Sequence, residues 1–141
     1  MITEISDKQA ENTRVAYALM AGIPSELIDL DLIRDMSASD ARMLQCNSCG
    51  CMAGWLSAHP YFKAQGLNAV VGHKESGWQV PLHLDEELFG NENMFNGSNR
   101  TLLPAKGQKQ EALERLRLHL LNTGRITQQR SDQLELQEQE F

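Results

Sequence analysis

The segment 46–67, CNSCGCMAGWLSAHPYFKAQGL, constrains this chain more than any other stretch. All three cysteines of the chain fall within it, at Cys46, Cys49 and Cys51. A run of small and apolar residues that carries Gly54 and Trp55 follows at once. Cysteines this close together favour one of three arrangements: a metal knot, a disulfide, or a tightly packed helix that uses cysteine as a packing residue.

Zinc is the metal that this spacing would suit. A structural zinc site usually takes about four thiolate or imidazole ligands, and Cys46, Cys49, Cys51 and His59 would supply them. A zinc knuckle, however, pairs its first two cysteines with a second, distant Cys or His pair. The other histidines are scattered singly, at 73, 83 and 119. We therefore keep a small zinc-binding adaptor as the alternative and expect no cofactor.

Packing is the interpretation that we favour for the cysteines. Free cysteine is among the residue types most often buried, so we expect Cys46, Cys51, Gly54 and Trp55 to be structural residues. A nucleophilic role would need a thiol with a lowered pKa, for example at a helix N-terminus. Cys49 would meet that condition, and a thiol enzyme that uses it is a third and weaker hypothesis.

Length and charge narrow the classes of protein further. A chain of 141 residues fits one domain. Its formal net charge of −6 argues against a surface that coats nucleic acid or adsorbs to a membrane. We expect no secretory signal, because the first residues lack a basic start and no long apolar segment follows them. The odd number of cysteines does not suggest a disulfide framework. These features indicate a soluble protein of the reducing cytosol.

Apolar periodicity and capping residues predict a mostly helical chain. The helices that we expect span 6–21, 49–58, 84–89 and 108–123. Pro60 either starts a further short helix over 60–65 or kinks the helix over 49–58. Residues 25–36 are ambiguous between a short helix and an extended buried segment. Gly54 costs about 1 kcal/mol inside a helix relative to alanine, so its presence predicts a close backbone contact.

A small hairpin and a tail complete the expected fold. Residues 68–82 contain two β-branched runs that flank a polar loop, which predicts a β-hairpin. The segment 126–141 is rich in glutamine and acidic residues and has few core formers, so we expect a disordered or partner-dependent tail. The predicted fold class is an α-rich α+β fold, with a single compact domain over 1–125 and a mobile C-terminal tail. The leucines of 108–123 would serve equally as an internal core contact or as the seam of a homo-oligomer.

The stretch from Cys46 to Trp55 resembles a signature of short proteins of tailed phages, prophages and bacteria. That signature reads Cys-Gly-Thr, two variable residues, Cys-Ala, one variable residue, Gly, then Trp or His. Further matching pieces follow in order at 59–62, 66–67, 88–90 and Phe95, so the resemblance covers roughly 46–95. Asn47-Ser48 replaces Gly-Thr, the alanine is shifted by one position to Ala53, and Cys49 is extra. The resemblance implies a phage or prophage accessory protein and supplies no catalytic residues.

Binding, rather than catalysis, is the function that these observations favour. No Walker loop, dinucleotide fingerprint, HExxH motif or serine elbow occurs. Trp78, Arg100 and Lys106 are the candidate ligand- or partner-binding residues, since tryptophan and arginine often anchor interfaces. We expect an accessory protein in the cytoplasm of a bacterial host. It would inhibit a host protein, such as a defence component, or sequester a small signalling ligand.

Overall fold

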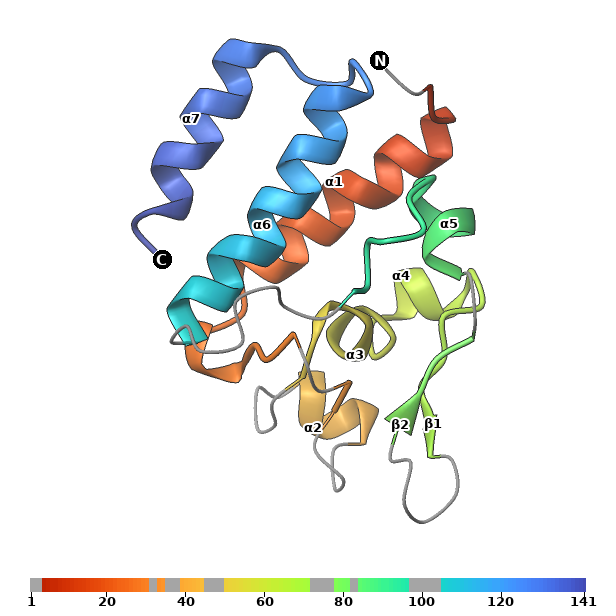
Figure 1. The fold of residues 1–141 in the computed structure, drawn as a ribbon. Coiled ribbons are helices and arrows are strands. Elements are labelled where there is room, and N and C mark those ends of the chain that lie inside the picture. The colour runs from red at the N-terminus through yellow and green to blue at the C-terminus, as the bar shows by residue number, and fades with distance from the viewer. Residues whose placement is uncertain are drawn as a thin grey trace.

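Helices α1 (Asp7–Ala21) and α6 (Ala105–Asn122) lie side by side and form the largest helix–helix contact among the described residues (Figure 1). The computed structural model describes residues 4–30, 33–34, 39–44, 50–71, 78–81, 84–96 and 105–141. Its other elements are the 3₁₀ turn η1 (Ser25–Leu27), the helices α2 (Asp40–Leu44), α3 (Met52–Leu56), α4 (Pro60–Lys63), α5 (Leu84–Phe89) and α7 (Gln128–Glu138), and the strands β1 (Val70–Val71) and β2 (Trp78–Gln79). The domain is therefore single and mostly helical.

Local sequence signals set the ends of the two long helices. The Ser6 hydroxyl accepts a hydrogen bond from the backbone N–H of Gln9 (3.0 Å), and the Gln9 side chain accepts one from the Ser6 N–H (2.9 Å). This capping box starts α1 where the sequence predicts a helix over 6–21. At the end of α6, Gly124 has a φ of 74°, and its N–H and that of Arg125 return to the carbonyls of Leu121 and Leu120. That pattern is a Schellman motif, which glycine favours.

The helix predicted over 49–58 is shorter than expected. The structure places α3 at Met52–Leu56, with Cys51 as its N-cap. Gly50 is held outside the helix because its N–H donates to Leu27 O (3.0 Å) and its carbonyl accepts from the Asp29 N–H (3.0 Å). The ambiguous segment 25–36 accordingly begins as η1 and continues as extended chain at Ile28, bridged to Gly50. The helix expected over 60–65 is α4, and the one over 84–89 is α5 with the same bounds.

Gly54 makes the close backbone contact that its position in a helix predicts. A Cβ atom added at Gly54 would lie 1.6 Å from the carbonyl oxygen of Ile33, and one added at Gly50 would lie 2.6 Å from the same atom. The extended chain at 33–34 therefore presses directly on the backbone of α3. Glycine is required here because a side chain would occupy the space that the second backbone fills.

The core lies between α1 and α6 on one side and α3, α4 and α5 on the other (Figure 1). Its largest fully buried apolar side chains include Met20, Phe62, Phe89, Leu113 and Leu116. The rings of Phe62 and Phe89 lie 5.9 Å apart between centroids. This cluster joins every described helix except α7 to one apolar interior.

The two strands are very short. Val70 pairs with Gln79 and Val71 with Trp78 in antiparallel register. The connecting residues, 72–77, lie outside the described residues. The hairpin predicted over 68–82 therefore stays a prediction, and the two strands make only a minor contribution to a helical domain.

The prediction of a tail over 126–141 is wrong. Residues 128–138 form the helix α7, which packs against α6 (Figure 1). The Thr127 side chain accepts a hydrogen bond from the N–H of Arg130 and starts the helix. Ser131, Leu134 and Glu138 are buried on its inner face. The composition of the segment hid this helix because two of the three buried residues are polar.

Candidate functional site

A buried arginine organises the polar cluster of this fold. Arg34 is 1% exposed, yet it carries a full positive charge. Its Nε donates to the carbonyl of Gly54 (3.0 Å), and its Nη2 donates to the Ser57 hydroxyl (2.9 Å). A buried guanidinium is tolerated only when it is paired and hydrogen-bonded. The close approach of 33–34 to α3 brings Arg34 to these two acceptors.

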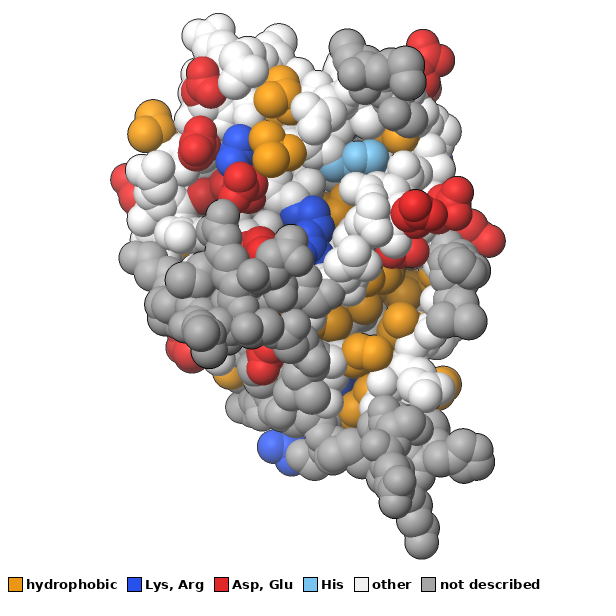
Figure 2. Space-filling model, in the orientation of Figure 1, with side chains coloured by type: hydrophobic (Ala, Val, Ile, Leu, Met, Phe, Trp, Pro, Cys, Tyr) orange, Lys and Arg blue, Asp and Glu red, His pale blue; other side chains and the backbone are white. Residues whose placement is uncertain are grey.

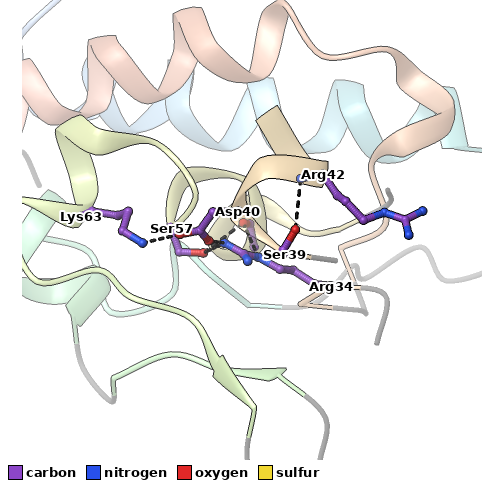
Figure 3. Close-up of polar contacts among 7 residues, drawn as sticks. Arg34, Ser39, Asp40, Arg42, Ser57 and Lys63 are labelled. Atoms are coloured by element: carbon purple, nitrogen blue, oxygen red, sulfur yellow. Dashed lines mark hydrogen bonds and ion pairs between the residues drawn. The ribbon is translucent and has the colours of Figure 1, made fainter. Parts of the chain in front are cut away.

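Asp40 supplies the negative charge that this arginine needs. Its Oδ1 lies 2.8 Å from Arg34 Nη2, and its other oxygen pairs with the ammonium of Lys63. Figure 3 shows Asp40 between these two cations, while the Arg42 side chain points away from them. Burial opposes ionisation of Asp40, but the hydrogen bonds and charges of Lys63 and Arg34 outweigh it and lower the pKa of this carboxyl. Asp40 is therefore ionised at neutral pH.

Trp78 lies against the other side of the same arginine. The guanidinium carbon of Arg34 is 4.9 Å from the centre of the Trp78 ring, which is cation–π distance. The indole is half-buried, so one part contacts the cluster and another part reaches solvent. The sequence singles out Trp78 as a candidate binding residue, and the structure places it beside Arg34 and the charged pair.

Exposed apolar side chains occur at the same end of the molecule. Leu44 on α2 is 54% exposed and Val70 on β1 is 58% exposed. In Figure 1, α2 and the two strands form the end of the domain opposite α7. We call the exposed parts of α2, α4, β1 and β2 that carry Asp40, Leu44, Lys63, Val70 and Trp78 the α2–β surface. It combines apolar side chains, a half-exposed aromatic ring and an ion pair.

The structure describes one of the three cysteines. Cys51 is 4% exposed and belongs to the hydrophobic core. Burial raises the pKa of its thiol, although backbone hydrogen bonds at the start of α3 oppose that shift. The thiol is therefore protonated at neutral pH, which makes it a poor nucleophile. Cys46 and Cys49 lie outside the described residues, so the thiol-enzyme hypothesis for Cys49 stays untested.

His59, the fourth candidate zinc ligand, caps a helix. Its Nδ1 accepts a hydrogen bond from the backbone N–H of Tyr61 (3.2 Å) at the start of α4. No group of three or more His, Cys, Asp or Glu side chains with metal-binding geometry occurs within the described ranges. Those ranges exclude Cys46 and Cys49, so a zinc site that uses them stays a prediction.

The other residues that the sequence singled out divide into two groups. Trp55 is 6% exposed, and its indole N–H donates to Leu27 O (3.0 Å), which places it in the core beside Gly54. Arg100 and the side chain of Lys106 lie outside the described part of the chain. Their place relative to the α2–β surface therefore stays untested.

Sequence reasoning missed Arg34, Asp40 and Lys63. Each comes from a different segment, and no spacing connects 34, 40 and 63. The one available signal was the arginine at the end of 27–34, a segment in which apolar residues alternate with two aspartates, since a charge in such a segment must find partners when it is buried.

A polar hollow lies elsewhere, between the C-terminal ends of α5 and α6. It has a volume of about 510 Å³ and is lined by residues that include Glu86, Asn91, Glu92, His119 and Asn122. The His119 ring nitrogen contacts the carbonyl of Phe89 at 2.5 Å. Ligand pockets are usually lined mainly by apolar side chains, and this one is not. Acidic side chains gather over α5 and α7 (Figure 2).

Comparisons of the chain with models of known protein families, with curated protein sequences and with solved structures found no match. None of the helices in the described ranges is both long enough and apolar enough to cross a membrane.

Proposed function

We propose that this chain is an accessory protein of phage type that acts by binding a host protein and inhibiting it. The α2–β surface would be the binding surface, and the cytoplasm of a bacterial host would be the setting. We also take β1 and β2 to be the arms of the hairpin expected over 68–82. The resemblance of 46–95 to phage and prophage proteins motivates the setting. The character of the α2–β surface motivates the activity.

One observation carries the proposal. Of the described residues, only Leu44, Val70 and Leu136 are large hydrophobic residues classed as exposed. Two of them, Leu44 and Val70, lie on the α2–β surface. Fully burying an exposed leucine or valine is worth about 1.5–3 kcal/mol, so leaving both in water favours any partner that covers them.

The Trp78 ring is already ordered for such a partner. Its contact with Arg34 fixes one face, and the contacts of Arg34 with Gly54, Ser57 and Asp40 fix the guanidinium. A rigid aromatic side chain loses little entropy on binding, which is why tryptophan dominates many interfaces. Asp40 and Lys63 would then form the polar rim that sets orientation.

A protein partner fits this surface better than a small ligand does. Small-molecule sites are concave and mostly apolar. The large described hollow is polar and lies elsewhere in the fold, between α5 and α6. The apolar groups of the α2–β surface instead project outward from α2 and β1, as the groups of a protein interface do.

The experiment is a capture from host lysate followed by a quantitative binding measurement with the purified partner. The test variant is the double substitution Leu44→Ser, Val70→Ser, and the matched control is Leu136→Ser on α7. All three side chains are more than half exposed, so neither variant should lose stability. The double variant should bind at least about tenfold more weakly, a loss of about 1.4 kcal/mol, and the control should bind like the parent chain.

The same variants test function in a phage that carries the gene. The parent chain and Leu136→Ser should restore growth of a deletion strain on the host, and the double variant should not. The proposal fails if no host protein is captured and deletion has no phenotype. It also fails if the double variant binds and complements like the parent.

A further inference from the structure

Polar side chains make up most of the buried face by which helix α7 is attached to the domain. Its buried residues are Ser131, Leu134 and Glu138, which recur at intervals that place them on one face of the helix. Only one of the three is apolar. The outer face carries acidic side chains (Figure 2) and Leu136, which is 66% exposed. The specificity of the contact therefore depends on its polar groups.

Glu138 and Arg117 form the centre of that contact. Arg117 Nε lies 2.9 Å from Glu138 Oε2, and both side chains are about 5% exposed. The Tyr17 hydroxyl donates to the same oxygen (2.7 Å), and Arg117 Nη1 donates to the Ser131 hydroxyl (2.9 Å). Burial, together with the hydrogen bond to Glu138, raises the pKa of Tyr17. The surface of α1 and α6 beneath α7 is therefore a receptor for one carboxylate and one hydroxyl, two helical turns apart.

The last residues of the chain extend the same contact. The ring of Phe141 lies 4.3 Å from Lys109 Nζ. That ammonium donates to the carbonyls of Ala21 (2.8 Å) and Ile23 (2.6 Å), at the end of α1. A segment of another chain that bound here would need a carboxylate at the place of Glu138 and a ring at the place of Phe141. The α7 segment of a second copy of this chain has both.

The connection between α6 and α7 contains one residue in the left-handed conformation, Gly124, beside Arg125, which bonds to Asp7 and Ile5, and the cap Thr127. Gly124 has a φ of 74°, and a Cβ added there would meet nothing within 4 Å. The only obstacle to a side chain at this position is therefore the left-handed backbone. In a straight helix from α6 into α7, the buried positions 117, 120, 131, 134 and 138 would follow one heptad stripe. Straightening would thus keep the contact face of α7 in phase with that of α6.

We propose that α7 exchanges between two copies of this chain, so that the α7 of each copy occupies the Arg117–Tyr17 receptor of the other. The buried contacts of Ser131, Leu134 and Glu138 are preserved in such a dimer. Straightening the connection would replace the Thr127 cap and the hydrogen bonds of Arg125 to Asp7 and Ile5 by helical hydrogen bonds. Exchange of a terminal element is a low-cost route to a symmetric dimer for this reason. The proposal concerns the α7 side of the molecule and does not depend on the α2–β surface.

The first experiment compares Gly124→Ala with Gly66→Ala in the full-length chain. Gly66 also has a positive φ, of 98°, and also has nothing within 4 Å of an added Cβ, but it follows α4 and takes no part in the connection to α7. Alanine disfavours the left-handed turn by a factor of about 5, and a dimer has two straightened connections. The dissociation constant of the dimer should therefore fall by about 25-fold in Gly124→Ala and should not change in Gly66→Ala. Sedimentation over a range of concentrations measures both.

The second experiment distinguishes exchange from any other dimer. A chain with Arg117→Glu places two carboxylates in the contact, and a chain with Glu138→Arg places two cations there. Mixed together, each chain's α7 complements the receptor of the other only if the helices exchange. Native mass spectrometry should show a one-to-one heterodimer after mixing, and neither chain should form a dimer alone. A monomeric Gly124→Ala chain at all concentrations, or the absence of the heterodimer, overturns the proposal.

Discussion

The contact between Gly54 and the segment 33–34 gives the sharpest test of this fold. Alanine at 54 would place its Cβ 1.6 Å from Ile33 O, less than half of the 3.4 Å at which ordinary contact begins. Two of the three nearest atoms belong to backbone, so no side-chain rotation relieves the clash. The extended chain at 33–34 must separate from α3 instead.

The magnitude follows from what that separation breaks. It would lengthen the hydrogen bonds from Cys51 N–H to Ile33 O (3.3 Å) and from Arg34 Nε to Gly54 O (3.0 Å). Overpacking alone costs about 1–3 kcal/mol, and a buried charge that loses a partner costs about 3–5 kcal/mol. Alanine gains about 1 kcal/mol of helix propensity. Arg34 keeps its contacts with Ser57 and Asp40, so the lower part of these ranges applies. The free energy of unfolding should therefore fall by about 3–5 kcal/mol.

Thermal and urea unfolding, followed by the fluorescence of buried Trp55, measure the effect. Gly54→Ala should lower Tm by roughly 10–20 °C for a chain of this size. The control is Gly22→Ala, whose Cβ would meet its nearest atom at an ordinary 3.6 Å. That variant should stay within about 0.5 kcal/mol of the parent chain. A Gly54→Ala chain as stable as the parent would refute the reasoning.

Four further predictions concern single groups. Asp40→Asn should lower the free energy of unfolding by roughly 1–2 kcal/mol at neutral pH, between the values for exposed and buried pairs. The folded-state pKa of Asp40 lies below its ordinary value of 3.8. The difference in the free energy of unfolding between parent and variant should therefore be complete above about pH 5 and should disappear as pH falls through 3.8 and below. A difference that does not depend on pH would contradict this. Cys51 should resist iodoacetamide in the native chain and react only on unfolding, as peptide mapping will show; labelling at the unfolded rate would be inconsistent with its burial. Because the pKa of Tyr17 is raised, its phenolate absorbance should appear only at pH values above the ordinary tyrosine pKa of 10. The free energy of unfolding should fall as pH rises past 10. The Tyr17→Phe chain should lack this late phase of the absorbance titration. Metal analysis should find no stoichiometric zinc, whereas about one zinc per chain would support the adaptor that uses Cys46 and Cys49.

The helices that the sequence predicts correctly carry their own local signals. Ser6 with Gln9 starts α1, and Gly124 stops α6. Both signals act within a few residues, so they can be read without knowing the fold. The glycine inside α3 also predicts a close contact, although only the structure identifies the partner as Ile33.

Long-range contacts explain why α7 and the α2–β surface escaped prediction. The stability of α7 depends on Arg117, which lies 21 residues before Glu138 in the sequence. Likewise, Arg34 meets Lys63 only through Asp40, and three separate segments must fold before the cluster exists. The segment 126–141 is poor in apolar residues, and a prediction from composition assumes that a packed helix needs them. In α7, the ion pair between Glu138 and Arg117 replaces part of that apolar contact.

Gly54 and Trp55, which belong to the sequence signature behind the phage-type proposal, both lie inside the scaffold. Gly54 leaves room for the backbone of Ile33, and the Trp55 indole N–H donates a hydrogen bond to the carbonyl of Leu27. In this chain, a signature at these positions therefore marks an internal backbone contact and does not identify a binding partner. The choice of binding partner should instead depend on the exposed residues of the α2–β surface, because those side chains can change without disturbing the contact between Gly54 and Ile33.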